Sequence, residues 1–180
     1  MRELRLAEFY RDESVKPGVQ DRAGVKEDID QARENGARII ASATRVENFF
    51  EEIITLYFFG TGKKEKIEFF RETVLEAHFF SFHSKWKLFR AILRELTPKG
   101  FMSNEERKDV CRAASEVISW RNAFAHGEVV YRDEALFLRY FEGGEKEQEL
   151  SDEYWLGVEE LFAGALRDVV GVRERMRKGL

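Results

Sequence analysis

The stretch Arg121-Asn122-Ala123-Phe124-Ala125-His126-Gly127 closes a helical pattern that begins at about Asn104. Apolar residues recur in this segment at the spacing of a helix with about 3.6 residues per turn. They are Val110, Ala113, Ala114, Val117, Trp120 and Phe124. Glycine in the left-handed conformation is a common helix stop. The sequence therefore predicts a helix from about Asn104 to Ala125 that ends at a left-handed Gly127.

Three polar residues of this stretch are candidate site residues. Arg121 falls within the apolar stripe, and a buried guanidinium needs an anionic partner or ligand because it keeps its charge. Asn122 lies one turn before His126, so these two side chains can touch. Glu47, on the flank of another apolar helix face, is the candidate anion for Arg121. The alternative for Glu47 is a charge in solvent.

Composition indicates one globular domain in a reducing compartment. The chain has 180 residues, of which 43% are hydrophobic and 36% charged. It contains no apolar run of the roughly 18 residues that span a membrane and no secretory signal at its start. Cys111 is the single cysteine, which excludes an internal disulfide and a cysteine-based zinc site. We predict a cytoplasmic protein.

Charge and aromatic content bear on the partners. The formal net charge of −4 provides no global attraction to nucleic acid, so any RNA contact must depend on local basic patches. The chain has 16 Phe, many in adjacent pairs. They predict either a larger core or, in addition, a second surface that faces another subunit.

Periodicity and punctuation predict the remaining elements. Residues 1–24 are a polar leader, and residues 25–180 form a single helical domain. Helices are predicted over about 25–59, 64–77, 85–96 and 152–176, with Ser84 and Ser151 as caps. Ser103-Asn104-Glu105-Glu106 has the form of a capping box.

After Gly127 the apolar period changes to two, which indicates strands at 128–131 and 136–141 and a short third one near Gln148. Asp133-Glu134 and Gly143-Gly144 are the predicted turns. The predicted fold is mainly α: an antiparallel helical bundle with a β-hairpin or small β-meander, at about 128–150, before the C-terminal helix.

Two further patterns each allow two interpretations. Small and polar residues form a second stripe on the helix that ends at Ala125, and this stripe faces either a ligand or second subunit, or solvent: Cys111, Ser115, Ser119, Asn122 and His126. The basic tail (Arg173, Arg175, Arg177 and Lys178) either complements the helix dipole or contacts an RNA backbone.

No metal or cofactor site is predicted. His78 and His83 have no metal-ligand partner four residues on, so structural roles are favoured for both. No phosphate-binding loop and no HExxH-type motif occurs in the chain.

The segment Ile118-Ser119-Trp120-Arg121-Asn122-Ala123-Phe124-Ala125-His126-Gly127 resembles the signature of the HEPN superfamily. That signature is an Arg, often followed by a polar residue, and a His after four to six intervening residues. The preceding FFSFHSKWKLFRAIL is similar to the helix before the motif in HEPN-like proteins related to the mannitol operon repressor. The resemblance covers about Gly36–Gly127.

This resemblance implies an antiparallel helical bundle that dimerises through the motif helices, here about 104–126. It also implies a metal-independent endoribonuclease, a toxin or phage-defence effector whose products are a 2′,3′-cyclic phosphate and a 5′-hydroxyl. His126 would be the general acid/base, Arg121 the phosphate clamp, and Asn122 would orient His126 or contact substrate. An antitoxin or a nucleotidyltransferase is an implied partner.

Two features of the sequence leave alternatives open. Some HEPN toxins that pair with a nucleotidyltransferase carry a Tyr two residues after the His, where this chain has Glu128. Arg121 and His126 are about 140° apart on an ideal helix, so a shared site requires the helix to end or distort near Ala125. The alternative function is a catalytically silent HEPN-like module that binds a protein or nucleotide.

Overall fold

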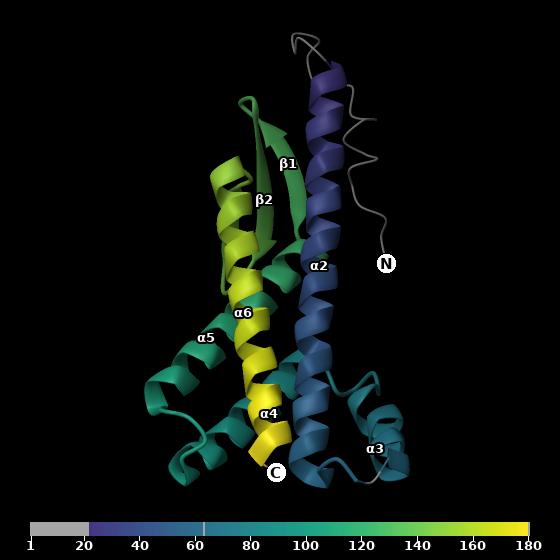
Figure 1. Cartoon of the computed structure of the whole chain (residues 1–180). Helices are drawn as coiled ribbons and strands as arrows, with labels where there is room; N and C mark the ends of the chain where they lie inside the picture. Colours follow the sequence, from purple (N-terminus) through teal and green to yellow (C-terminus); the bar gives the residue numbers. More distant parts are fainter. Residues whose placement is uncertain (1–21, 63, 180) are drawn as a thin grey trace. The chain divides into compact units, whose positions relative to one another are not determined.

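The computed structural model of the protein describes residues 22–62 and 64–179, which are mainly α-helical (Figure 1). Their five α-helices are α2 (Arg22–Phe59), α3 (Lys64–Phe70), α4 (Phe82–Leu96), α5 (Asn104–His126) and α6 (Asp152–Gly179). A three-stranded antiparallel meander precedes α6. The predicted fold class is therefore confirmed. The predicted leader lies outside the described residues as far as position 21, and residues 22–24 already belong to α2.

The chain divides into two compact units. Unit 1 comprises the described residues of Met1–Ile40 and Trp120–Val158, and unit 2 comprises those of Ala41–Ser119 and Glu159–Leu180. All three boundaries, after residues 40, 119 and 158, fall inside helices, so no linker separates the units in sequence. The prediction that residues 25–180 form a single domain stays a prediction.

Unit 2 contains a segment of every α-helix and has phenylalanines at the centre of its core. Phe50 of α2 and Phe89 of α4 are fully buried and stack with their ring centroids 4.4 Å apart. Phe82 packs on Phe50 at 5.8 Å. The same unit buries apolar side chains from four helices: Val46, Ile53, Ile54, Leu93, Val117, Val169, Val172 and Met176. Burial of each such side chain stabilises the fold by roughly 2 kcal/mol.

Unit 1 contains the meander, whose strands are β1 (Glu128–Arg132), β2 (Ala135–Phe141) and β3 (Glu145–Glu149) in that spatial order. Asp133 and Glu134 connect β1 to β2 with φ of 51° and 62°, the positive values of a tight hairpin turn whose twist matches its strands. Leu138, in the middle of β2, is 1% exposed. The predicted strands and turns are confirmed, including the third strand.

Helix caps explain where the helices begin. The Ser103 hydroxyl accepts a hydrogen bond from the Glu106 backbone N–H at 3.0 Å, and Ser151 does the same for Tyr154 at 3.2 Å. The predicted cap Ser84 is wrong, because α4 begins three residues earlier and Ser81 accepts the bond from the Ser84 N–H. The predicted helix 64–77 is α-helical only to Phe70 and continues as a π-helix over Arg71–Leu75.

We expect Ser81→Ala to lower the free energy of unfolding by about 1 kcal/mol, because the first turn of α4 loses its side-chain acceptor. Ser84→Ala is the matched control and should have a smaller effect, since within the described part of the chain the Ser84 hydroxyl accepts no backbone N–H. Urea unfolding followed by circular dichroism at 222 nm measures both. Equal losses in the two variants would contradict this assignment of the cap.

Candidate functional site at the end of α5

Aromatic side chains fix the orientation of the last turns of α5. In unit 1, Trp120 contacts Tyr154 at 5.2 Å and Tyr140 at 5.9 Å between ring centroids, and Phe124 contacts Trp155 at 5.5 Å. These rings surround a core of small and aliphatic residues: Ala32, Ala123, Leu138 and Leu150. Because one side of the helix is anchored in this cluster, its other sides present the polar residues of the motif.

Arg121 is half-buried, and the side chain that it hydrogen-bonds is a neutral amide and not a carboxylate. Its Nη1 donates a hydrogen bond to Asn122 Oδ1 at 3.1 Å. The helical period correctly places Trp120 and Phe124 against the core, but Arg121 lies at the margin of that face. Because the guanidinium retains access to water, it needs no buried counter-ion.

His126 is the last residue of α5 and its side chain is exposed. Within residues 22–62 and 64–179, no hydrogen bond joins it to Asn122, so the contact that their spacing permits is not made. An exposed imidazole at the carboxyl end of a helix is accessible both to solvent and to a ligand.

Gly127 has a different role from the one predicted. It is not among the residues with positive φ, so the prediction of a left-handed stop is wrong. A Cβ at this position would lie 2.3 Å from the carbonyl oxygen of Ala123 and 2.8 Å from that of Arg139. Its N–H also donates to Ala123 at 2.7 Å, which continues the helical pattern. Glycine is therefore required because the end of α5 lies directly against β2.

Since α5 continues through His126, the predicted end at Ala125 is short by one residue. The helix does not end early enough to bring Arg121 and His126 to the same side within one chain. Their separation around an ideal helix is about 140°.

Glu47 has neither of the two predicted roles. Its Oε1 accepts a hydrogen bond from Lys85 Nζ at 2.6 Å, and Glu51 Oε1 accepts another at the same distance. Arg71 of the π-helix lies 3.5 Å from the second oxygen of Glu51. The Lys85 and Glu51 side chains are 7% and 5% exposed, so this is a buried ion cluster within unit 2.

The cluster holds a charged lysine inside a core. Burial by itself would lower the pKa of Lys85, but the hydrogen bonds and charges of Glu47 and Glu51 outweigh burial and raise that pKa. Sequence reasoning missed the cluster, although one signal was present. Glu47 and Glu51 are four residues apart beside Phe50, and they share an edge of the apolar face of α2.

The stripe of small residues on α5 is divided between core and surface. Cys111 is buried, and burial raises the pKa of its thiol despite the nearby charges of Arg107 and Arg90. Ser115 is half-buried, whereas Ser119, Asn122 and His126 are exposed. Only the end of the stripe is therefore accessible to a ligand or subunit.

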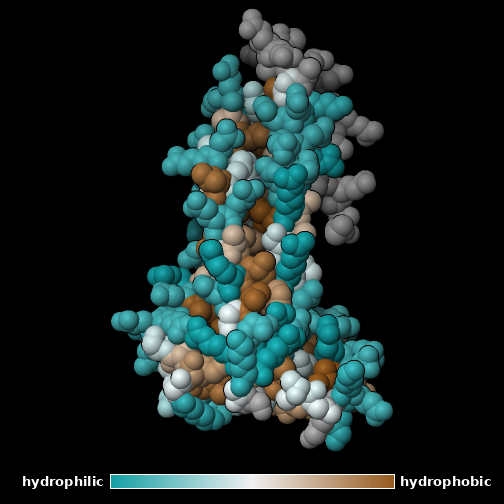
Figure 2. All heavy atoms as spheres, viewed as in Figure 1, coloured by the Kyte–Doolittle hydropathy of each residue, from teal (hydrophilic) through white to brown (hydrophobic). Residues whose placement is uncertain are grey.

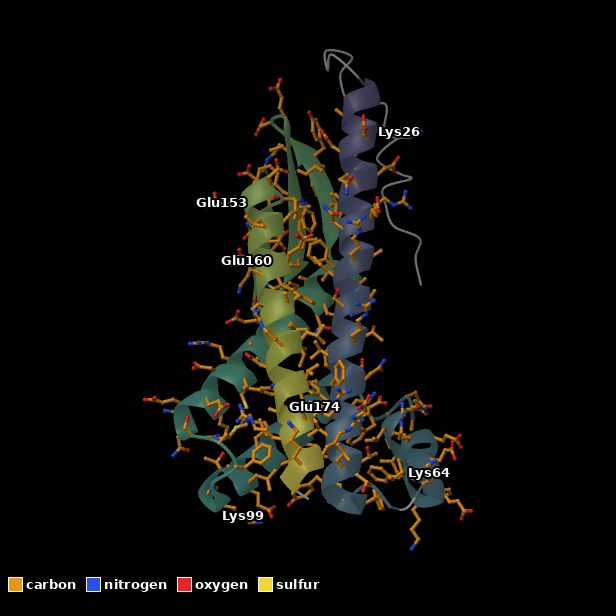
Figure 3. All side chains as sticks on the ribbon, viewed as in Figure 1. Lys26, Lys64, Lys99, Glu153, Glu160 and Glu174 are labelled. Atoms are coloured by element: carbon orange, nitrogen blue, oxygen red, sulfur yellow. The ribbon has the colours of Figure 1, made fainter. Side chains whose placement is uncertain are left out.

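The three arginines of the basic tail are paired with acidic residues of unit 2. Arg173 and Arg177 lie 3.2 and 3.4 Å from the same oxygen of Glu52, and Arg175 binds Glu106. Arg173 also contacts Glu174, which Figure 3 labels on α6. The hydrogen bond from Arg175 is the main reason that the pKa of Glu106 is lowered. These pairs give the tail an intramolecular role that neither predicted interpretation included.

Arginines of the meander are likewise paired with acids. Arg132 and Arg139 both bind Glu147, at 2.9 and 3.4 Å. Arg139 lies opposite Glu128 in the register of β1 and β2. The strand that follows His126 therefore belongs to a sheet whose guanidinium groups are already neutralised.

Among the described residues no three His, Cys, Asp or Glu side chains are grouped as metal ligands, and none of the described helices has the length and hydropathy of a membrane span. Comparison of the chain with protein families, with curated proteins and with solved structures found no match.

Proposed function

We propose that this protein is a metal-independent endoribonuclease of the HEPN type that acts as a homodimer. The observation that carries the proposal is the pair of accessible groups at the end of α5, Arg121 and the exposed His126, with Asn122 hydrogen-bonded to the guanidinium. Their sequence context is the part of the chain that resembles the HEPN signature. The proposal includes the cytoplasm as location, RNA as substrate, and a role as toxin or phage-defence effector.

In the proposed reaction the RNA 2′-hydroxyl attacks the adjacent phosphorus in line. His126 takes the proton from the 2′-hydroxyl as general base, and an imidazolium protonates the departing 5′-oxygen. Arg121 binds the equatorial phosphate oxygens, where negative charge accumulates in the transition state. Asn122 holds the guanidinium in position. The products are a 2′,3′-cyclic phosphate and a 5′-hydroxyl.

Two copies are needed for two reasons. One His126 cannot be base and acid in the same step, and Arg121 and His126 of one chain lie on different sides of α5. Pairing of the ends of two α5 helices supplies both roles from the two histidines and brings an arginine near each phosphate oxygen. The exposed, short side chains of Ser119 and Asn122 support close approach of a second helix there.

The test is RNA cleavage in excess EDTA by wild type, Arg121→Ala and His126→Ala, with single-stranded and structured RNA. We expect each variant to cleave at least about 100-fold more slowly, because each removes a group that acts on the reacting phosphate or proton. Arg112→Ala is the matched arginine control, since Arg112 is an exposed residue of α5 paired with Asp109. His83→Ala is the matched histidine control, since His83 is an exposed imidazole stacked on Trp86.

Both controls should cleave like wild type, and end-labelling should detect the cyclic phosphate. Cleavage that survives in His126→Ala would be due to a contaminant or to another site and would contradict the proposal. Absence of cleavage by wild type, at high concentration and without a partner, would favour the second candidate.

The second candidate is a catalytically silent HEPN-like module that binds a protein or nucleotide. The observation in its favour is that arginines of α6 and of the meander are already paired with glutamates. The net charge of −4 points the same way. Such a surface attracts an RNA backbone weakly. In this case the partner sought is a protein or a nucleotide. An antitoxin or a nucleotidyltransferase is instead a partner of the proposed toxin, and the Tyr that is modified in some HEPN toxins paired with a nucleotidyltransferase is replaced here by Glu128.

A further inference from the structure

Helix α4 carries a row of cations on its exposed side. Lys87, Arg90 and Arg94 follow one another at intervals of three and four residues, so they lie within about 60° around the helix and extend over about 10 Å along it. All three residues are exposed. No Asp or Glu occurs from Ala77 to Arg94, although the chain has 34 of these acids. The row is therefore a local basic patch in a protein whose net charge is −4.

This row differs from the basic groups of α6 and of the meander in its lack of acidic partners. Hydrophilic residues predominate on the face of the molecule that Figure 2 shows, so polarity alone does not distinguish a binding surface. Arginines of α6 and of the meander are paired with glutamates, and Lys99, which Figure 3 labels, lies 3.0 Å from Glu95. By contrast, none of the three cations of the row has an ion pair within residues 22–62 and 64–179. Their charges are available to an external anion.

An aromatic ring holds Arg90, the middle member of the row. The Arg90 Cζ lies 5.1 Å from the centroid of the Trp86 ring, about one turn earlier in α4. A guanidinium over an aromatic face is attracted by the ring, so this side chain loses less conformational entropy when it binds an anion. Its planar array of N–H donors matches the oxygens of a phosphate group. Arg90 is thus partly organised for phosphate binding before a ligand arrives.

A fourth cation extends the patch from α4 to α5 within unit 2. Arg107 is half-buried, and its Nε is buried without a hydrogen-bond partner in the described part of the chain. The positive charges of Arg107 and Arg90 both act on the thiol of Cys111, where they oppose the rise in pKa that burial causes. Since both charges act on one thiol, Arg107 of α5 lies near Arg90 of α4.

A linear polyanion is the ligand that suits such a row. Successive phosphates of a nucleic-acid strand can contact successive side chains, and each contact releases counterions from the strand. A membrane surface suits it less, because a helix that binds lipid inserts its apolar face into the bilayer. On α4 that face is buried, since Phe89, Leu93 and Leu96 belong to the core.

We propose that four cations form a binding surface for the phosphate backbone of RNA: Lys87, Arg90, Arg94 and Arg107. The choice of RNA as the nucleic acid rests on the proposed function. The surface binds RNA and takes no part in the reaction at the end of α5. Binding through this surface and cleavage by His126 can therefore be measured separately.

The test is the salt dependence of RNA binding, measured by fluorescence anisotropy. The probe is a labelled single-stranded RNA of about 12 nucleotides, within the range of site sizes for single strands. His126→Ala is the background for every variant, so that cleavage does not consume the probe.

We expect Lys87→Gln, Arg90→Gln and Arg94→Gln each to remove one phosphate contact. The plot of the logarithm of the binding constant against the logarithm of the salt concentration should become less steep by about 0.7 for each variant and by about 2 for the triple variant. At 0.1 M salt, a change of 0.7 in this slope corresponds to a Kd about fivefold higher for each single variant. A purely structural effect would raise Kd without changing the slope.

Matched controls remove the same charge elsewhere in unit 2. Lys64 and Lys66 of α3 are exposed and have no ion pair in the described part of the chain, but acidic residues alternate with them. Lys64→Gln and Lys66→Gln should therefore leave both slope and Kd unchanged. Arg90→Lys keeps the charge and should keep the slope. Circular dichroism of each variant shows that the fold is retained.

Three outcomes would overturn the proposal. The first is a protein that binds no RNA at about 100 μM, the weak end of non-specific nucleic-acid binding, including one that binds anionic lipid vesicles instead. The second is a triple variant whose slope is unchanged, and the third is an equal change of slope in the α3 controls.

Failure of this proposal is distinguishable from failure of the proposed function. If wild type cleaves RNA but the triple variant binds it with an unchanged slope, this surface is refuted and the nuclease is not. If wild type binds RNA with the expected slope changes but does not cleave it, the surface is supported and the nuclease is refuted.

Discussion

Replacement of Lys85 by Met is expected to lower the free energy of unfolding by about 3 kcal/mol. Glu51 is 5% exposed and keeps its negative charge in the variant, while its strongest partner is gone. Arg71, at 3.5 Å from Glu51, compensates in part, which places the expected loss at the lower end of the range for broken buried ion pairs. Urea unfolding at neutral pH measures the loss. A loss below about 0.5 kcal/mol, which is the size of the effect of a surface substitution, would contradict the prediction.

A combined variant separates loss of charge pairing from loss of packing. Lys85→Met with Glu47→Gln and Glu51→Leu leaves no buried charge unpaired, so it should recover most of the stability that the single variant loses. If the combined variant were as unstable as Lys85→Met, packing of the lysine stem would be the cause.

The effect of Lys85 should also depend on pH in a defined direction. Because the pKa of Lys85 is raised in the folded protein, its contribution to stability is complete below the unfolded-state pKa of about 10.4. That contribution is lost as the pH rises through the higher folded-state pKa. The stability difference between wild type and Lys85→Met should therefore be constant near neutral pH and shrink above about pH 10.4. If this stability difference shrank only on acidification, the prediction that Lys85 is charged in the folded protein would be contradicted.

Gly127→Ala is expected to destabilise the protein by about 3 kcal/mol. The added Cβ would meet two backbone oxygens, those of Ala123 and Arg139, which cannot rotate away as side-chain atoms can. The end of α5 must then separate from β2, and the backbone of the neighbouring His126 moves with it. Urea unfolding measures the loss, and amide hydrogen exchange should be faster in β1 and in the last turn of α5.

Gly157→Ala is the matched control for Gly127→Ala. A Cβ on Gly157 meets nothing within 4 Å, and this residue lies inside α6, so the same substitution should stabilise the protein by about 0.5–1 kcal/mol. Opposite signs for the two glycines are the result that the structure predicts. A neutral Gly127→Ala would mean that α5 does not contact β2 this closely.

Local sequence signals were sufficient for most of the fold. Ser103 and Ser151 cap the helices that were predicted from them, because a cap needs only a hydroxyl and the N–H three residues later. Asp133-Glu134 turns the chain between two alternating segments, as predicted. Periodicity identified the buried side of α5, including Val117 at 0% exposure.

Local signals failed where two candidates competed or where a neighbour was distant in sequence. Ser81 and Ser84 both have the chemistry of a cap, and packing of Phe82 in the core starts α4 at the earlier one. Cys111 shares a stripe with exposed residues but is itself buried, which its place in the stripe does not indicate.

The candidate site shows the same division. Arg121, Asn122 and His126 were found from their spacing, but the burial of Arg121 was overestimated. Helical periodicity predicts the direction in which a side chain points, but it does not predict how wide the buried face of the helix is. The role of Glu47 was missed because Lys85, its partner, is 38 residues away in sequence.

By itself, the sequence determined most of the helices, the caps Ser103 and Ser151, the meander and the position of the RNAFAH motif at a helix end, since each depends on residues within a few positions of one another. Only the tertiary structure decided that Lys85 binds Glu47 and Glu51, that the arginines of the basic tail pair with Glu52 and Glu106, and that Gly127 must lack a side chain. The physical reason is that charge pairing and steric exclusion act between atoms that are close in space. Folding brings those atoms together from parts of the chain whose local patterns contain no information about one another.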